Sequence, residues 1–232
     1  MSLIDIREGG FLLIDKPLNW TSFDVVKKLR NVSRIKKIGH AGTLDPLASG
    51  LVIVCYGKYT KKIEGIQAQI KEYIGSFHLG KTTSSFDLET EVDGEFPTEH
   101  INTALLQSAA KLFLGDIEQV PPQHSAIKIN GKRAYEHARK GEEVELKSRT
   151  LNISKFEIDD TTFPTVSFLV ECSKGTYIRS LARDYGLALN SGAYLSSLRR
   201  TKIGEYDVEN AIGPEKIGSQ EDFFSFALQF PD

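Results

Sequence analysis

Residues that often reveal a protein's chemistry are scarce in this chain. Its 232 residues include two cysteines, one methionine and one tryptophan. Cys55 and Cys172 lie in the apolar, strand-like runs LVIVCYG and VSFLVECS, away from any CxxC spacing or histidine cluster. We therefore interpret both as packing residues rather than as a disulfide, a metal site or a nucleophile.

Long apolar runs are missing as well. No run approaches the roughly 18 residues that a membrane-spanning helix needs, and the first residues do not show the charged, apolar and small-residue order of a signal peptide. A hydrophobic content of 40% supports a well-buried core. Without a repeat or a low-complexity linker, we expect one domain over residues 1–232, acting as a soluble cytoplasmic monomer.

An excess of positive charge is also missing, because the formal net charge is -2. This argues against a uniformly basic nucleic-acid binder. The charges are nevertheless unevenly distributed, and the segment Val25–Thr43 holds basic side chains and no acidic one. The basic residues of this segment are Lys27, Lys28, Arg30, Arg34, Lys36 and Lys37. Such a segment is typical of a solvated helix face or of a surface that binds phosphates.

Periodicity and punctuation predict strands and helices in alternation. Strands are predicted at residues 10–17, 51–57, 71–80, 151–158, 165–172 and, as a pair, 193–200 and 202–208. Helices are predicted after Thr21-Ser22 with Phe23 and Val26 inward, at 60–66, at 101–115 ending on a C′ Gly115, at about 133–140 after an Asn130-Gly131 turn, at 175–189 and at 223–230. Because several strands are adjacent in sequence, we expect an α+β fold with a mixed, largely antiparallel central sheet.

The stretch GHAGTLDPLASG, residues 39–50, places a single carboxylate among small residues. Asp45 followed by Pro46 has the pattern of a helix N-cap with proline at the first helical position. On this stretch alone, the capping interpretation is favoured over a catalytic role.

Four stretches together resemble the TruB family of tRNA pseudouridine synthases, which isomerise uridine 55 in the T-arm of tRNA. They are LLIDKPLNWTS at 12–22, GHAGTLDPLASG at 39–50, KEYIGSFHLGKTTSSFD at 71–87 and CSKGTYIRSLARDYG at 172–186, with YLSSLRRT at 194–201 after them. The order and spacing of the motifs are those of the family over residues 10–205. The resemblance implies the pseudouridine synthase fold and an isomerase that acts on a flipped base.

The reaction breaks the bond from the base nitrogen to the sugar, turns the uracil and joins a base carbon to the same sugar carbon. A carboxylate can serve as its covalent or charge-stabilising partner, and no metal or cofactor is required. The resemblance assigns Asp45 as the catalytic aspartate and Tyr73 as the aromatic residue against the uracil, whose phenol oxygen can accept the C5 proton through a relay. Arg179 matches the arginine that pairs with the aspartate. Alone, Tyr73 and Arg179 have the pattern of a half-buried strand tyrosine and a surface helix arginine.

Five further positions match substrate-binding residues of the family. Tyr177 and Leu198 match residues that line the uracil pocket, although their spacing is also that of core residues. His40 matches a substrate-contacting histidine, for which we favour filling the gap left by the extruded base over general base catalysis. Lys16 and Pro17 match the first motif, which braces the active-site loop.

The chain departs from the family pattern at three points. Asn19 stands where the family has glycine, and Asn tolerates a left-handed backbone. Ser85 replaces a threonine but keeps the hydroxyl. About 25 residues follow KIGEYDV, too few for the RNA-binding PUA domain of many members. We therefore expect the catalytic domain alone to hold the tRNA T-arm. The expected phosphate contacts are the segment 27–37, Lys128, Lys132, Arg133, Arg199, Arg200 and Lys202.

Two other functions remain open. A tRNA-binding folding chaperone without turnover would use the same RNA-binding surface but would not need the aspartate. A glycoside or nucleoside hydrolase would use a second carboxylate, for which Asp87 and Asp184 are the nearest candidates; we interpret both as structural. No metal ligand spacing joins His40 to the other histidines.

Overall fold

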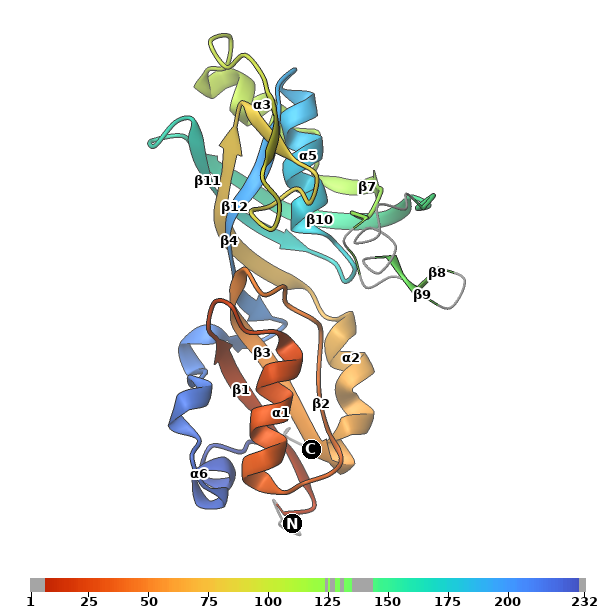
Figure 1. Cartoon of the computed structure of the whole chain (residues 1–232), viewed down its shortest axis with the longest axis vertical. Helices are drawn as coiled ribbons and strands as arrows, with labels where there is room; N and C mark the ends of the chain where they lie inside the picture. The colour runs from red at the N-terminus through yellow and green to blue at the C-terminus, as the bar shows by residue number, and fades with distance from the viewer. Residues whose placement is uncertain (1–6, 124, 126–127, 130–131, 135–143, 230–232) are drawn as a thin grey trace. The chain divides into compact units, whose positions relative to one another are not determined.

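The computed structural model describes residues 7–123, 125, 128–129, 132–134 and 144–229, and its chain divides into two compact units (Figure 1). The first unit comprises Met1–Tyr73 and Leu198–Asp232, and the second comprises Ile74–Ser197. The strands β4 (Lys71–Leu79) and β12 (Ala193–Ile203) each supply residues to both units.

The sheet of the first unit is built around strand β3 (Ala48–Gly57). Strand β1 (Gly9–Lys16) pairs with it antiparallel, from Gly9 opposite Gly57 to Lys16 opposite Gly50. Strand β2 (Ile38–His40) is also antiparallel to β3, and the C-terminal part of β12 runs parallel to it. Strand β13 (Tyr206–Asp207) pairs antiparallel with the end of β12. The predicted strands GFLLIDKP and LVIVCYG are confirmed as β1 and β3.

Helix α1 (Ser22–Ser33) begins at Thr21 as predicted, with a capping box between Thr21 and Asp24. Its buried stripe contains Val25, Val26 and Leu29. The inward prediction for Phe23 is wrong, because this side chain is 59% exposed. The cap at Thr21 fixes the helix start, and Phe23 then lies about 200° around the helix from Val25.

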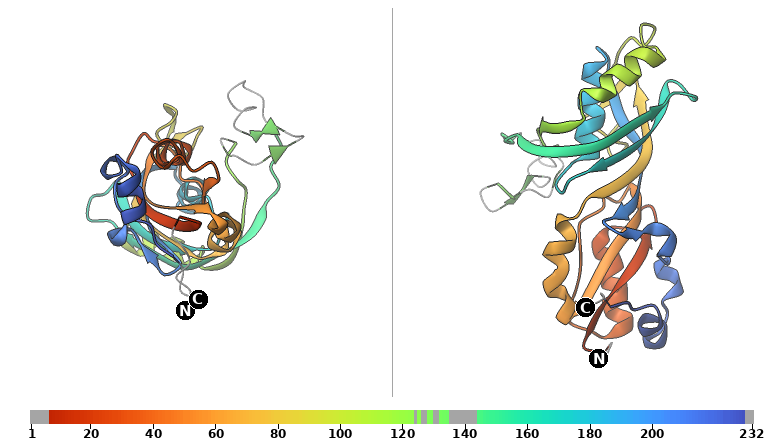
Figure 2. Two further views of the ribbon diagram at one scale, coloured as in Figure 1. Left: turned by 90° about the horizontal axis from the view of Figure 1, so that it is seen from below. Right: turned by 180° about the vertical axis from the view of Figure 1, so that it is seen from behind.

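The other helices of the first unit are short: η1 (Lys58–Lys62), α2 (Ile63–Ala68), η2 (Val208–Asn210), η3 (Pro214–Lys216) and α6 (Gln220–Ser225). Ile66 of α2 packs on the sheet face that carries Phe11 and Ile53. Helices α1 and α2 lie on different sides of β1 and β3 (Figure 2). In α6, the ring of Phe223 lies 5.0 Å from that of Tyr56. The helix predicted over 223–230 ends earlier than predicted, at Ser225.

The second unit continues the sheet in the order β12-β4-β11-β10-β7. Strand β10 (Arg149–Asp159) pairs antiparallel with both β11 (Thr165–Cys172) and β7 (Gly115–Gln119). Two small antiparallel pairs join β5 (Lys81–Thr83) to β6 (Val92–Glu95) and β8 (Lys128–Ile129) to β9 (Lys132–Arg133). The predicted α+β class with a largely antiparallel central sheet is confirmed.

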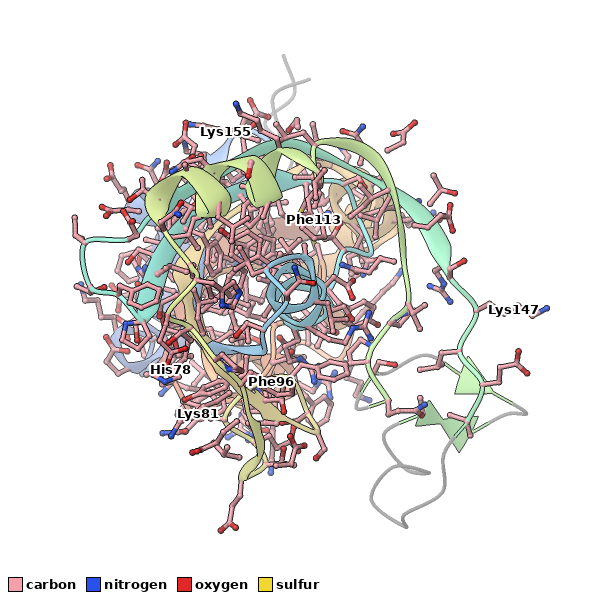
Figure 3. The ribbon with its side chains drawn as sticks, turned by 90° about the horizontal axis from the view of Figure 1, so that it is seen from above. His78, Lys81, Phe96, Phe113, Lys147 and Lys155 are labelled. Carbon is pink, nitrogen blue, oxygen red and sulfur yellow. The ribbon has the colours of Figure 1, made fainter. Side chains whose placement is uncertain are left out.

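Helices α3 (Thr103–Lys111) and α5 (Ile178–Ala188) cover the core of the second unit. In that core, the ring of Phe77 stacks on Phe168 at 4.3 Å, and Phe113, labelled in Figure 3, lies 6.2 Å from Phe156. The prediction of Gly115 as the C′ residue of α3 is wrong. The helix ends at Lys111, turns follow, and Gly115 opens β7 with φ 86°.

The predicted Asn130-Gly131 turn and the helix predicted at 133–140 lie outside the described residues, apart from Arg133 in β9 and Ala134. Both cysteines are free and buried, Cys55 in β3 and Cys172 in β11, which confirms the packing interpretation. Within the described ranges, no helix combines the length and the hydropathy needed to cross a membrane.

Candidate active site

The Asp45 loop, defined here as residues 41–47, connects β2 directly to β3. No helix follows Asp45. Pro46 and Leu47 form a turn, the amide of Ala48 donates to the carbonyl of Asp45 at 3.1 Å, and β3 begins at Ala48. The helix-cap interpretation of Asp45 is therefore wrong, because the chain enters a strand where a helix was expected.

Four residues of the first unit hold the Asp45 loop in place, and the first two are Ser22 and Asn19. The amide of Leu44 donates to Ser22 Oγ at 2.8 Å, which ties the loop to the first turn of α1. The amide of Asn19 donates to the carbonyl of Pro46 at 2.8 Å. Asn19 has φ 65°, so the left-handed conformation predicted at this departure from the family pattern is present. The backbone on both sides of Asp45 is thus fixed by hydrogen bonds.

Lys16 is fully buried at the end of β1 and acts as the third anchor. Its Nζ donates to the carbonyls of Pro17 at 2.9 Å, Trp20 at 2.6 Å and Pro46 at 3.5 Å. Burial lowers the pKa of Lys16 to about 8, and the nearby charge of Asp45 opposes this shift. One ammonium group therefore joins the turn after β1 to the turn that carries Asp45, as expected for a bracing residue.

Arg200 is the fourth anchor, and the phosphate contact predicted for it is wrong. We expected it to contact phosphate, but it is 1% exposed. Its guanidinium donates to the carbonyls of Leu51 at 2.7 Å, Gly42 at 3.3 Å and Thr43 at 3.4 Å. Five donors in a fixed fork allow one arginine to satisfy several carbonyls at once. The double arginine in YLSSLRRT carried no signal that separates a buried from an exposed side chain.

The neighbouring basic residues of β12 are partly engaged with acids. Arg199 pairs with Asp15 through Nη2 at 2.7 Å and Nη1 at 3.0 Å, and Lys202 Nζ lies 3.5 Å from Glu72 Oε2. Both remain partly exposed. The side chains of Lys128, Lys132 and Arg133 lie outside the part of the chain that the structure describes.

Leu198 and Tyr73 belong to the same unit as Asp45. Leu198 lies opposite Ala48 in the parallel pairing of β12 with β3. Ala48 follows Asp45 by three residues in the chain. This close pairing requires Gly50, which has φ 105° and lies opposite Arg200; a Cβ there would meet the Arg200 carbonyl at 2.3 Å. Tyr73 is 8% exposed on β4. Tyr73 lies on a strand as predicted, but it is buried rather than half-buried.

His40 ends β2 and is half-buried immediately before the Asp45 loop. Burial lowers the pKa of His40, the backbone of Gly42 opposes this shift, and the charge of Arg200 lowers it further. The imidazole is therefore neutral at pH 7. A neutral ring is compatible with the gap-filling role that the resemblance implies.

Arg179 and Tyr177 belong to the second unit. Arg179, in the first turn of α5, is 5% exposed, so it is not the surface residue that its position alone indicates. Its Nε lies 3.6 Å from Asp87 Oδ2, and its Nη1 donates to the carbonyl of Ser85 at 3.4 Å. Tyr177 is the N-cap of α5, and its amide donates to Gln119 Oε1 at 2.9 Å. The pairing of Arg179 with Asp45 stays a prediction.

The acidic partner of Arg179 comes from the TTSSFD segment. Asp87 is 5% exposed, and its Oδ1 accepts the amide of Glu89 at 2.9 Å. The hydroxyl of Ser85 donates to the carbonyl of Asp87 at 3.2 Å, so the serine that replaces threonine keeps a hydrogen-bonding role. Asp184 pairs with Arg183 at 2.7 Å. Among the described residues, no group of three or more His, Cys, Asp or Glu side chains is arranged to hold a metal ion.

Comparisons with known proteins agree with this architecture. The family model "TruB family pseudouridylate synthase (N terminal domain)" matches residues 30–178. The chain is 58% identical over 212 residues to "tRNA pseudouridine synthase B" of Flavobacterium johnsoniae, covering 88% of this chain and 93% of that protein. It is 55% identical over 220 residues to the protein of the same name from Parabacteroides distasonis, covering 92% and 94%.

A solved structure also matches over most of the chain. The "Crystal Structure of a Cbf5-Nop10-Gar1 Complex" contains a chain that is 29% identical to this protein, with a TM-score of 0.71. The match covers 95% of this protein and 60% of that chain. The chain thus spans about 60% of that solved protein. The fold is that of the pseudouridine synthases. More specifically, the chain belongs to the TruB family, whose members are isomerases.

Proposed function

We propose that this protein converts uridine 55 in the T-arm of tRNA to pseudouridine, with Asp45 as the essential carboxylate. The names of the relatives from Flavobacterium johnsoniae and Parabacteroides distasonis support tRNA as the substrate. The observation that carries the role of Asp45 is the Asp45 loop itself. Its backbone is held by Lys16, Ser22, Asn19 and Arg200, and it begins no helix that the carboxylate could cap.

The reaction rearranges bonds within one nucleotide. The bond between N1 and the sugar carbon C1′ breaks, the uracil turns, and a bond forms between C5 and C1′. C5 then loses its proton, which restores the C5–C6 double bond, and N1 takes up one proton. No atom is added and no electron is transferred, so atoms and charge balance without a co-reactant. Asp45 acts as the nucleophile or the charge-stabilising partner in the first step. A fixed backbone lowers the entropy that this carboxylate loses on reaching the target atom.

The remaining site residues have binding and positioning roles. Tyr73 stacks on the flipped uracil and accepts the C5 proton through a relay, while Tyr177 and Leu198 line the pocket. His40, neutral at pH 7, fills the space that the extruded base leaves. Lys16 and Pro17 brace the loop, and Arg179 keeps the catalytic carboxylate ionised. Because these residues come from both compact units, we propose that the two units act together as one catalytic domain.

The experiment is pseudouridine mapping on an unmodified tRNA transcript incubated with the purified chain, without added metal or cofactor. We expect conversion at the T-arm uridine 55 and at no other uridine. A transcript with cytidine at position 55 is the matched control and should give no product. Conversion at a different uridine would overturn the proposed position. Tight binding without any conversion would favour a tRNA-binding chaperone instead.

A further inference from the structure

The exposed side of α1 and the turn before it form a hollow outside the residues assigned to catalysis. Its volume is about 500 Å³, within the range of sites that hold small molecules. The lining residues are Asn19, Trp20, Asp24, Lys27, Lys28, Asn31 and Val32. We call this feature the Trp20 hollow; it lies entirely within the first unit.

Trp20 supplies a planar apolar surface on a rigid support. Its carbonyl accepts a hydrogen bond from Lys16 Nζ at 2.6 Å, and the preceding Asn19 is held to Pro46. The indole is half-buried and, over the described residues, stacks on no other ring. An aromatic face that the fold fixes but does not cover is suited to stacking on a nucleic-acid base.

The charges of the hollow favour an anion. In the described ranges, Lys27 and Lys28 form no ion pair, and Lys27 is exposed. The single acid, Asp24, accepts from the amide of Thr21 at 2.9 Å and from its hydroxyl at 2.6 Å. These bonds lower the pKa of Asp24 and keep its carboxylate on the helix cap. The hollow therefore holds two lysines and one acid, and this acid is already bonded to Thr21. The side-chain amide of Asn31 also lines the hollow.

The hollow is joined to the Asp45 loop by one side chain. Lys16 Nζ contacts both the carbonyl of Trp20 and that of Pro46, next to Asp45. The turn that carries Trp20 and the Asp45 loop are therefore adjacent within the first unit. The hollow offers an aromatic face, two lysines and a position next to the Asp45 loop. This combination suits a single-stranded nucleotide better than a peptide or a lipid.

We propose that the Trp20 hollow binds a nucleotide of the substrate tRNA other than the target uridine, with its base on Trp20 and its phosphate on Lys27 and Lys28. This inference rests on the proposed function for the identity of the RNA. It assigns to the lysine-rich helix a defined subsite rather than a diffuse positive surface.

Trp20 is the only tryptophan of the chain and is therefore a built-in probe. The experiment measures acrylamide quenching of its fluorescence while unmodified tRNA transcript is added to the full chain. We expect tRNA to protect Trp20 from acrylamide at least threefold. Unchanged quenching at saturating tRNA would overturn the proposal, because the indole would then remain open to solvent in the complex.

Variants test the same site through affinity. Lys27→Ala with Lys28→Ala should raise the Kd for tRNA at least fivefold and lower the salt slope by about 1.4, the value for two single-strand phosphate contacts. Trp20→Ala should raise the Kd by a similar factor or more. The matched control is Lys111→Ala with Lys216→Ala, which removes two exposed lysines elsewhere and should change neither quantity. Equal effects of the two double variants would contradict a specific subsite.

Failure of this inference is distinguishable from failure of the proposed function, because uridine 55 conversion is measured separately on the wild type. Conversion with an unprotected Trp20 removes the subsite and leaves the function. Protection that depends on Lys27 and Lys28, without any conversion, keeps the subsite and removes the function.

Discussion

Arg179 Nε lies 3.6 Å from Asp87 Oδ2, and both side chains are almost fully buried. The sequence motifs connect Arg179 with Asp45, but they give no partner for Asp87. The structure shows that the TTSSFD segment delivers a carboxylate to the first turn of α5. A second carboxylate for hydrolysis was one alternative for Asp87, and an acid held in a buried ion pair is poorly suited to that role.

We predict that Asp87→Asn lowers the free energy of unfolding by about 3 kcal/mol, because removing one partner of a buried ion pair is strongly destabilising. Asparagine keeps the Oδ1 atom that accepts the hydrogen bond from the Glu89 amide. The loss of stability therefore measures the removal of the negative charge. Chemical denaturation measures the change. Asp93→Asn, at an exposed position where the carboxylate accepts from Thr82 Oγ1, should cost less than about 1 kcal/mol and serves as the control. Equal losses would contradict the ion-pair account.

Arg200→Met should destabilise the first unit by about 2–4 kcal/mol, because the carbonyls of Gly42, Thr43 and Leu51 lose their donor in a buried place. The long apolar replacement keeps most of the volume. Denaturant unfolding of the full chain measures the loss, and Arg199→Met on the partly exposed Arg199 should cost less. A loss below about 0.5 kcal/mol for Arg200→Met would show that the loop does not depend on these bonds.

Gly50→Ala should destabilise the fold by more than 2 kcal/mol, since the new Cβ meets the Arg200 carbonyl at 2.3 Å and φ is 105°. Gly115→Ala is the matched control. It shares a positive φ, at 86°, but has no atom within 4 Å of the Cβ, so it should cost only about 1 kcal/mol. Thermal unfolding separates the two. If both variants lose equal stability, backbone strain rather than the close approach of β3 and β12 explains Gly50.

The pKa of Lys16 predicts a pH dependence with a defined sign. Folded Lys16 loses its proton at about pH 8, whereas the unfolded chain keeps that proton until about pH 10.5. Between these values the unfolded state binds more protons, so stability rises with pH. Relative to Lys16→Met, the wild type should gain about 3 kcal/mol from pH 8 to 10.5. A difference in unfolding free energy that stays flat over this range would contradict a depressed pKa.

Most of the fold could be predicted from sequence because its strands are strongly apolar and its turns carry glycine, asparagine or proline. LVIVCYG and TVSFLVEC are short and rich in β-branched residues, which favours a strand over a buried helix. Local rules failed where a tertiary contact decided the outcome. Asp45-Pro46 has helix-start chemistry, yet the pairing of Ala48 with Leu198 draws the chain into β3. The prediction for Phe23 failed because the buried stripe of α1 is formed by Val25, Val26 and Leu29, and Phe23 lies outside this stripe.

The site could be predicted in part, because the motif positions name residues but not their surroundings. Lys16 was expected to brace the loop, and its three carbonyl contacts agree with that expectation. Arg200 was predicted to contact phosphate together with its neighbours Arg199 and Lys202, and no local pattern distinguishes it from them. Its burial follows from the parallel pairing of β12 with β3, a long-range contact that no local pattern encodes.

The central claim is that Asp45 performs the chemistry, and single-turnover conversion of uridine 55 by Asp45→Asn tests it most directly. We expect no conversion, tRNA affinity within about twofold of the wild type and a loss of unfolding free energy below about 1 kcal/mol. Asp207→Asn, which alters a carboxylate that caps a short helix of the same unit, should convert the substrate at the wild-type rate. Conversion by Asp45→Asn at a rate close to that of the wild type would contradict the account.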